Sequence, residues 1–109
     1  MLGLILSLCL SAFAATPEAL LAEGQTKQRA GDTTGAQAAY EACLAEAPDH
    51  PGCHWELGWS HWTKGEWDEV VRHWEHTKRV KPDWPELDRY LPTAKDHRDV
   101  AARLRANRQ

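Results

Sequence analysis

The stretch from His50 to Trp84, HPGCHWELGWSHWTKGEWDEVVRHWEHTKRVKPDW, contains all 6 tryptophans of this 109-residue chain. Its apolar residues recur at helical spacing, a Lys-Gly pair at 64–65 interrupts it, and Lys-Pro-Asp closes it. Apolar residues three and four positions apart lie on one side of an α-helix, whereas Gly and Pro mark where helices end. The stretch therefore predicts two helices joined by a tight turn.

An earlier copy of the same pattern lies 34 residues upstream, as the step from Pro17 to Pro51 shows. The other coincidences fall mostly where helices begin and end: Gly24 with Gly58, Gly31 with Gly65, Glu41 with Glu75, and Pro48-Asp49 with Pro82-Asp83. Pro85 falls one further period on. Self-similarity at a fixed period of about 20 to 50 residues is typical of repeat proteins. The sequence therefore predicts an all-α chain of two hairpins and part of a third unit.

The repeat resembles the tetratricopeptide repeat (TPR) family, whose pattern is W-x2-L-G-x2-Y, A-x3-F, P. The second unit supplies His54-x2-Leu57-Gly58-x2-His61, Val70-x3-Trp74 and Pro82. The first unit supplies Leu20-x2-Glu23-Gly24-x2-Lys27, Ala36-x3-Tyr40 and Pro48. The match is good at the Gly, Ala, aromatic and Pro positions, and it departs from the family where Trp and Tyr stand on the first helix. The resemblance implies TPR repeat 1 over 16–50 and TPR repeat 2 over 51–84.

Residues 85–107 are predicted to form a kinked C-terminal capping helix, with Leu87, Tyr90 and Leu91 on one side. Pro92 lacks the N–H that a helix interior needs, so it should kink the helix or divide it into two pieces. Terminal caps with a polar outer face keep short repeat arrays soluble. The predicted fold is thus two TPR helix-turn-helix hairpins followed by a cap.

Residues 1–15, MLGLILSLCLSAFAA, carry no charge and end in small residues with an Ala-Phe-Ala pattern, which predicts a secretory signal peptide. The run is too short to span a bilayer, which takes about 20 apolar residues. Because no Lys or Arg precedes the apolar run, a misassigned start or a retained apolar helix are the alternatives. We expect a protein of the bacterial periplasm or a secreted protein, with no integral membrane span in the mature chain.

Cys43 and Cys53 are the two cysteines that follow this leader, and they flank the turn between the two units. In an oxidising compartment, an even number of cysteines so placed predicts a disulfide. The alternative is a zinc site built from Cys43, His50, Cys53 and His54. That set has no recognised ligand spacing, and two of its members are adjacent, so the disulfide is favoured.

The sequence does not favour catalysis. It contains no HExxH, Gly-rich phosphate loop or GxSxG motif, and no carboxylate pair stands in an apolar setting. His73 and His76, three residues apart on a predicted helix, are assigned a packing or surface role. With 13 basic and 16 acidic residues, the net charge of −3 excludes a general polyanion-binding surface. Neither an enzyme activity, nor a metal, nor a cofactor, nor a nucleic acid partner is expected.

The TPR resemblance implies a protein-interaction module that holds an extended peptide or a partner helix in a concave groove. The groove positions of this family fall on Trp55, Trp59 and Trp62 in the second unit and on Gln25, Gln28 and Arg29 in the first. Indoles in place of Lys, Asn and Arg favour an apolar or aromatic segment over a C-terminal carboxylate. Glycan or cell-wall binding is the alternative, because indole faces stack on sugar rings.

The position of the cap decides whether these indoles form a groove or a core. A cap folded across them would bury them against Leu87, Tyr90 and Leu91, whereas a cap stacked behind the second unit would leave the groove open. An exposed row of indoles is costly in water, so the chain or a partner must cover it. We expect partial exposure, with Trp59 at the centre of the row.

Overall fold

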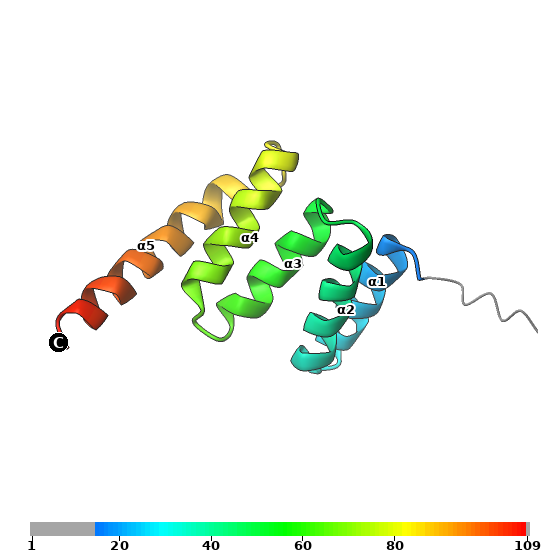
Figure 1. Ribbon diagram of the computed structural model, residues 1–109, viewed down its shortest axis with the longest axis horizontal. Helices are drawn as coiled ribbons and strands as arrows, with labels where there is room; N and C mark the ends of the chain where they lie inside the picture. The colour runs from blue at the N-terminus through cyan, green and yellow to red at the C-terminus, as the bar shows by residue number, and fades with distance from the viewer. Residues whose placement is uncertain (1–14, 109) are drawn as a thin grey trace, which may run out of the picture.

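The computed structural model describes residues 15–108 (Figure 1). In that range it contains the helices α1 (Pro17–Arg29), α2 (Thr33–Glu46), α3 (Pro51–Trp62), α4 (Trp67–Val80) and α5 (Leu87–Ala106). The predicted signal peptide lies outside the described residues except for its last residue, Ala15. Of the helices described, none combines the length and the apolar character that crossing a bilayer requires.

The helices pack as sequential pairs. α1 packs on α2, α3 on α4 and α4 on α5, and α2 contacts α3 between the two hairpins. In Figure 1 the helices follow one another in chain order from α1 at the right to α5 at the left. The prediction of an all-α chain is confirmed as a domain of five helices over residues 15–108.

The two hairpins have the same backbone plan. α1 and α3 begin at residues 17 and 51, and α2 and α4 begin at residues 33 and 67, so both steps equal 34 residues. The turn inside each hairpin contains a glycine with positive φ, 81° at Gly31 and 70° at Gly65. Glycine enters this left-handed region at little steric cost because it has no Cβ. The internal repeat predicted from sequence therefore exists in the fold.

A second glycine in each hairpin allows its two helices to cross closely. A Cβ at Gly24 of α1 would overlap the ring of Tyr40 on α2, and a Cβ at Gly58 of α3 would overlap the ring of Trp74 on α4. Both rings are fully buried. The two hairpins thus share one interlock of glycine and aromatic ring, and the second one contains the larger ring.

Two groups of buried side chains form the core. Leu57 of α3 packs with Ala36 and Tyr40 of α2, which joins the hairpins. The larger group comes from α3, α4 and α5 and consists of Trp55, Val70, Val71, Trp74, Leu87, Leu91 and Ala94. Most of the apolar burial therefore lies between the second hairpin and the C-terminal helix.

α5 runs through Pro92 as one helix from Leu87, so the two-piece form allowed for residues 85–107 is wrong. Pro92 stands near the start of the helix, where its missing N–H removes a single backbone hydrogen bond. Buried residues before and after it, Leu91 and Ala94, hold both sides of the proline against the core. The helix begins at Leu87 rather than at the predicted residue 85, because Glu86 takes a left-handed φ of 69°.

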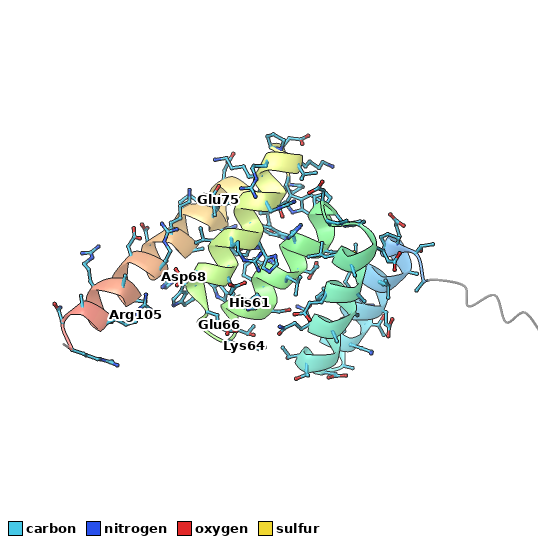
Figure 2. The ribbon with its side chains drawn as sticks, viewed as in Figure 1. His61, Lys64, Glu66, Asp68, Glu75 and Arg105 are labelled. Carbon is cyan, nitrogen blue, oxygen red and sulfur yellow. A yellow bond between two sulfur atoms is a disulfide. The ribbon has the colours of Figure 1, made fainter. Side chains whose placement is uncertain are left out.

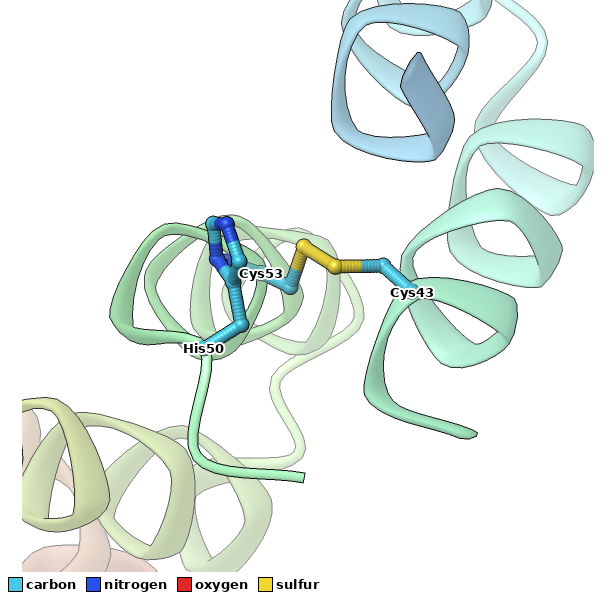
Figure 3. Close-up of side chains that lie close together, drawn as sticks. All are labelled: Cys43, His50 and Cys53. Carbon is cyan, nitrogen blue, oxygen red and sulfur yellow. A yellow bond between two sulfur atoms is a disulfide. The ribbon is translucent and has the colours of Figure 1, made fainter. Parts of the chain in front are cut away.

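Cys43, near the end of α2, and Cys53, in the first turn of α3, form the predicted disulfide (Figure 3). Their Cα atoms are 6.4 Å apart, and the bond links one hairpin to the next. His50 lies beside it, and its Nδ1 accepts a 3.2 Å hydrogen bond from the Cys53 N–H, which caps α3. Because the two sulfurs are bonded to each other, the alternative zinc site has no thiolate ligands.

Candidate functional site

Three residues predicted for the groove line one pocket. Gln25, Gln28 and Arg29 of α1 surround a cavity of about 400 Å³ together with Glu56 of α3. Residues three apart on a helix share a side, so Glu56 and Trp59 are neighbours on α3. Trp59 itself does not line the pocket, because its ring packs against Trp74 and Tyr90.

Hydrogen bonds organise the floor of this polar pocket. The Tyr40 hydroxyl donates a 2.7 Å hydrogen bond to Oε1 of Gln28. Burial raises the pKa of the Glu56 carboxyl, and a hydrogen bond from the Gln25 side chain acts in the opposite direction. The pocket thus offers fixed donors and acceptors to a polar group that enters it.

Trp55, the first of the three predicted indoles, belongs to the core. Its side chain is 8% exposed and stacks on Trp74 with ring centroids 4.8 Å apart. Its carbonyl oxygen accepts a 3.0 Å hydrogen bond from Nε1 of Trp74. At Trp55, burial by α4 and α5 therefore supports the core alternative and corrects the expected partial exposure.

Trp59 and Trp62 are partly buried at the edge of the same core. Trp59 meets Tyr90 of α5 edge to face with centroids 4.9 Å apart, and Trp62 meets Trp67 in the same way at 5.0 Å. The partial exposure expected at the centre of the row is present at Trp59. The C-terminal helix thus covers Trp55 and leaves part of the other two indoles accessible.

A cluster of histidines lies between α3 and α4, and the sequence analysis did not anticipate it. The rings of His54 and His76 stack with centroids 3.9 Å apart, and those of His61 and His73 stack at 5.4 Å. A cleft of about 370 Å³ beside them is lined from α2, α3 and α4. A signal existed in the sequence, since His54 and His61 occupy the positions where the TPR pattern has Trp and Tyr. His54 and His61 are seven residues apart, so both lie on the side of α3 that packs on α4, where His73 lies.

Hydrogen bonds fix the ring tautomers in this histidine cleft. The carbonyl oxygen of Pro48 can only accept, so Nε2 of His54, 2.7 Å away, is the donor. In a neutral imidazole Nδ1 of His54 then accepts, and Nδ1 of His73 at 2.9 Å must donate. Burial lowers the pKa of both histidines, to about 3 for His73, so both rings are neutral at pH 7. Nε2 of His73 is left with a lone pair, which accepts a 3.1 Å hydrogen bond from Nη2 of Arg72.

The outer histidines are paired with carboxylates. Nδ1 of His61 lies 3.1 Å from Oε1 of Glu66, which stands across the turn between α3 and α4 (Figure 2). Nε2 of His76 lies 2.8 Å from Oδ1 of Asp49. Each carboxylate accepts from the nearer ring nitrogen, which orients the imidazole.

A scan against protein-family models and a search of curated proteins found no match to this chain. The fold places it in the class of all-α domains made of stacked helical hairpins. Its surface offers two candidate sites, the polar pocket between α1 and α3 and the histidine cleft between α2, α3 and α4.

Proposed function

We propose that the chain is a TPR-type protein-interaction module that holds a segment of a partner across α1 and α3. The observation that carries the proposal is the polar pocket between α1 and α3. The partly exposed Trp59 follows the pocket residue Glu56 by three positions on α3. A pocket of fixed hydrogen-bonding groups beside a partly exposed indole suits a peptide, which has both backbone amides and apolar side chains. Trp is also a typical hot-spot residue of protein interfaces.

The backbone repeat supports the TPR assignment. The offset of 34 residues equals the period of that family. Gly24 and Gly58 stand at the family's glycine position, and each one receives the aromatic ring of its hairpin partner helix. The repeat is thus present in side-chain packing as well as in helix boundaries.

The chemistry of the pocket defines the expected partner. Glu56 contributes a carboxylate to the pocket wall, so a C-terminal carboxylate of a partner would meet a like charge there. A neutral backbone amide or a hydroxyl fits better, because the Gln25 and Gln28 side chains both donate and accept. The adjoining residue of the partner would then place an apolar or aromatic side chain against Trp59.

The disulfide supports export to the bacterial envelope or beyond it. Buried disulfides such as Cys43–Cys53 persist in oxidising compartments and are rare in the reducing cytosol. Intact-mass analysis of protein purified from its native compartment checks this proposal. We expect a chain that lacks its leader and is lighter by the two hydrogens of one disulfide, whereas an uncleaved chain with two free thiols would contradict export.

The binding proposal is tested by retention of partners from an envelope extract. The double variant Gln25→Ala/Arg29→Ala removes polar groups from the pocket without touching the core, and Trp62→Ala removes a partly exposed indole. Glu46→Ala, an exposed change on α2 outside both candidate sites, is the matched control. Parallel binding to peptidoglycan and soluble glycans tests the glycan alternative, because sugars would need the indoles and not the pocket.

We expect the pocket variant to lose the captured protein while its melting temperature stays within a few degrees of the parent. The control should retain both the captured protein and the melting temperature of the parent. Capture of a protein by parent and pocket variant alike would exclude the pocket as the binding surface. Retention on glycan alone, with loss in Trp62→Ala, would replace the protein-binding proposal with the glycan alternative.

A further inference from the structure

Three side chains at the histidine cleft meet in a way that the interaction proposal does not use. His61 of α3 and Glu69 and His73 of α4 each offer one ligand atom, and these atoms lie within 4.8 Å of one another. Glu69 and His73 are four residues apart, so they share one side of α4. All three line the cleft of about 370 Å³, which has room for water beside them.

Hydrogen bonds leave Nε2 of His73 in the protonation state that a metal ligand needs. The hydrogen-bond relay from Pro48 through His54 makes Nδ1 of His73 the protonated nitrogen and leaves Nε2 as a lone pair. Nε2 of His73 is also the atom on the side of Glu69, 3.9 Å from its Oε2. The tautomer and the direction of the ring therefore agree with a ligand role.

His61 has the second feature of a metal-binding imidazole. Its Nδ1 lies 3.1 Å from the Glu66 carboxylate, which accepts the N–H and leaves Nε2 unprotonated. Metal-bound histidines usually donate their other N–H to a carboxylate, a carbonyl or a water, which fixes the ring and raises its basicity. His61, with its N–H on Glu66, meets this requirement. His73 donates its N–H to the imidazole of His54 instead, and that hydrogen bond likewise fixes its ring.

We propose that His61, Glu69 and His73 form a binding site for a divalent transition-metal ion, with Zn²⁺ as the best-suited ion. Imidazole nitrogen and carboxylate oxygen are ordinary zinc ligands, and three protein ligands leave a fourth position open toward the cleft. Ligands about 2.1 Å from a tetrahedral ion lie about 3.4 Å apart, so atoms that lie within 4.8 Å of one another must close by up to about 1.4 Å (4.8 less 3.4). The Glu69 side chain is 41% exposed and can move toward the two imidazoles.

Arg72 contacts two of the three proposed ligands, Glu69 and His73. Its Nε lies 3.1 Å from Oε2 of Glu69, and its Nη2 lies 3.1 Å from Nε2 of His73. The guanidinium therefore binds the same two groups that the ion would bind, as a cationic substitute. The Arg72 side chain is 62% exposed, so it can turn into solvent when an ion enters. Arg72 should weaken metal binding, both as a competitor and as a like charge.

The test is calorimetric titration of ZnCl₂ into the tag-free, oxidised protein, in which the disulfide cannot bind metal. We expect one ion per chain with a Kd in the micromolar range or tighter. Glu69→Gln should weaken binding by at least about tenfold, as loss of a ligand does. The matched control Asp68→Asn, one residue away on the same helix, should bind like the parent. Arg72→Ala should bind about tenfold more tightly, which corresponds to about 1.4 kcal/mol.

A second measurement locates the ion independently of affinity. Ring signals of His61 and His73 in NMR spectra should shift on addition of Zn²⁺, while those of His97 stay in place. Circular dichroism of each variant verifies that the helices are intact. A parent Kd weaker than about 1 mM, an unchanged affinity of Glu69→Gln, or loss of binding in His50→Ala would each overturn the proposal.

Discussion

The two hairpins of this protein have the same backbone plan, and they differ in the side chains packed between their helices. In the first, Gly24 receives the ring of Tyr40, whose hydroxyl bonds outward to Gln28. In the second, Gly58 receives the ring of Trp74, whose Nε1 bonds inward to the Trp55 carbonyl. The first interlock therefore ends in a polar pocket, and the second ends in an aromatic core.

This difference shows that two copies of one repeat can have different roles in the molecule. The second hairpin packs against both neighbours, α2 on one side and α5 on the other, and it contains most of the buried apolar groups. The first hairpin has a neighbour on one side among the described residues, and its exposed helix α1 contributes the pocket. The same fold unit thus contains most of the core in one copy and, in the proposed function, the binding surface in the other.

Removal of the larger ring should have the largest effect. Trp74→Ala should lower the free energy of unfolding by about 3 to 5 kcal/mol, because it empties a site shared by α3, α4 and α5. Denaturant titration followed by circular dichroism measures the loss. Val80→Ala, an exposed change on the same helix, is the control and should cost little. A loss below about 1 kcal/mol for Trp74→Ala would show that the second hairpin is not the main source of stability.

Removal of the link between the hairpins should have a smaller effect. The disulfide closes a chain segment of sequence separation 10, so its loss should cost about 2 to 3 kcal/mol through the entropy of the unfolded chain. Thermal melts of the parent with and without reductant measure this cost. The double variant Cys43→Ala/Cys53→Ala should melt at a lower temperature and should not respond to reductant. A parent melt that reductant leaves unchanged would contradict the structural role of the bond.

The smallest effect is expected at the pocket. Burial raises the pKa of Glu56 in the folded state, so folding favours its protonated form. The stabilising contribution is therefore complete below the unfolded pKa of 4.5 and is lost as the pH rises through the folded value. Because the side chain is partly exposed, we expect less than about 1 kcal/mol.

Denaturation of the parent and of Glu56→Gln at pH 4, 5.5 and 7 isolates this contribution. The parent should lose stability relative to the variant as the pH rises. The difference between the two proteins removes the titration of all other groups, the histidines included. If the parent instead became more stable relative to Glu56→Gln as the pH rises, the pKa of this carboxyl would be lowered by folding. That result would contradict the effect of burial.

The TPR resemblance named Gln25, Gln28 and Arg29 as groove positions, and these three residues line one pocket. Their role in partner binding stays a prediction. Trp55 could not be distinguished from Trp59 in this way, because both lie on the same side of α3. Their burial depends on where α5 crosses them, and that is a contact between residues far apart in the chain.

The histidine cleft shows the same limit. The sequence placed His54 and His61 on one helix and His73 on the next. Each histidine taken singly, however, indicated only a packing role. Their meeting requires the specific rotation of α3 against α4, which side-chain volumes such as that of Trp74 set.

By itself the sequence determined the helices, their turns and the disulfide partners, because helix ends depend on local residues such as Pro17, Pro51, Gly31 and Gly65. Only the tertiary structure decided that Trp55 is core, that α5 continues through Pro92, and that three histidines with Glu69 and Arg72 line a cleft. The physical reason is that burial and ligand geometry depend on packing between helices. Local propensity does not encode that packing.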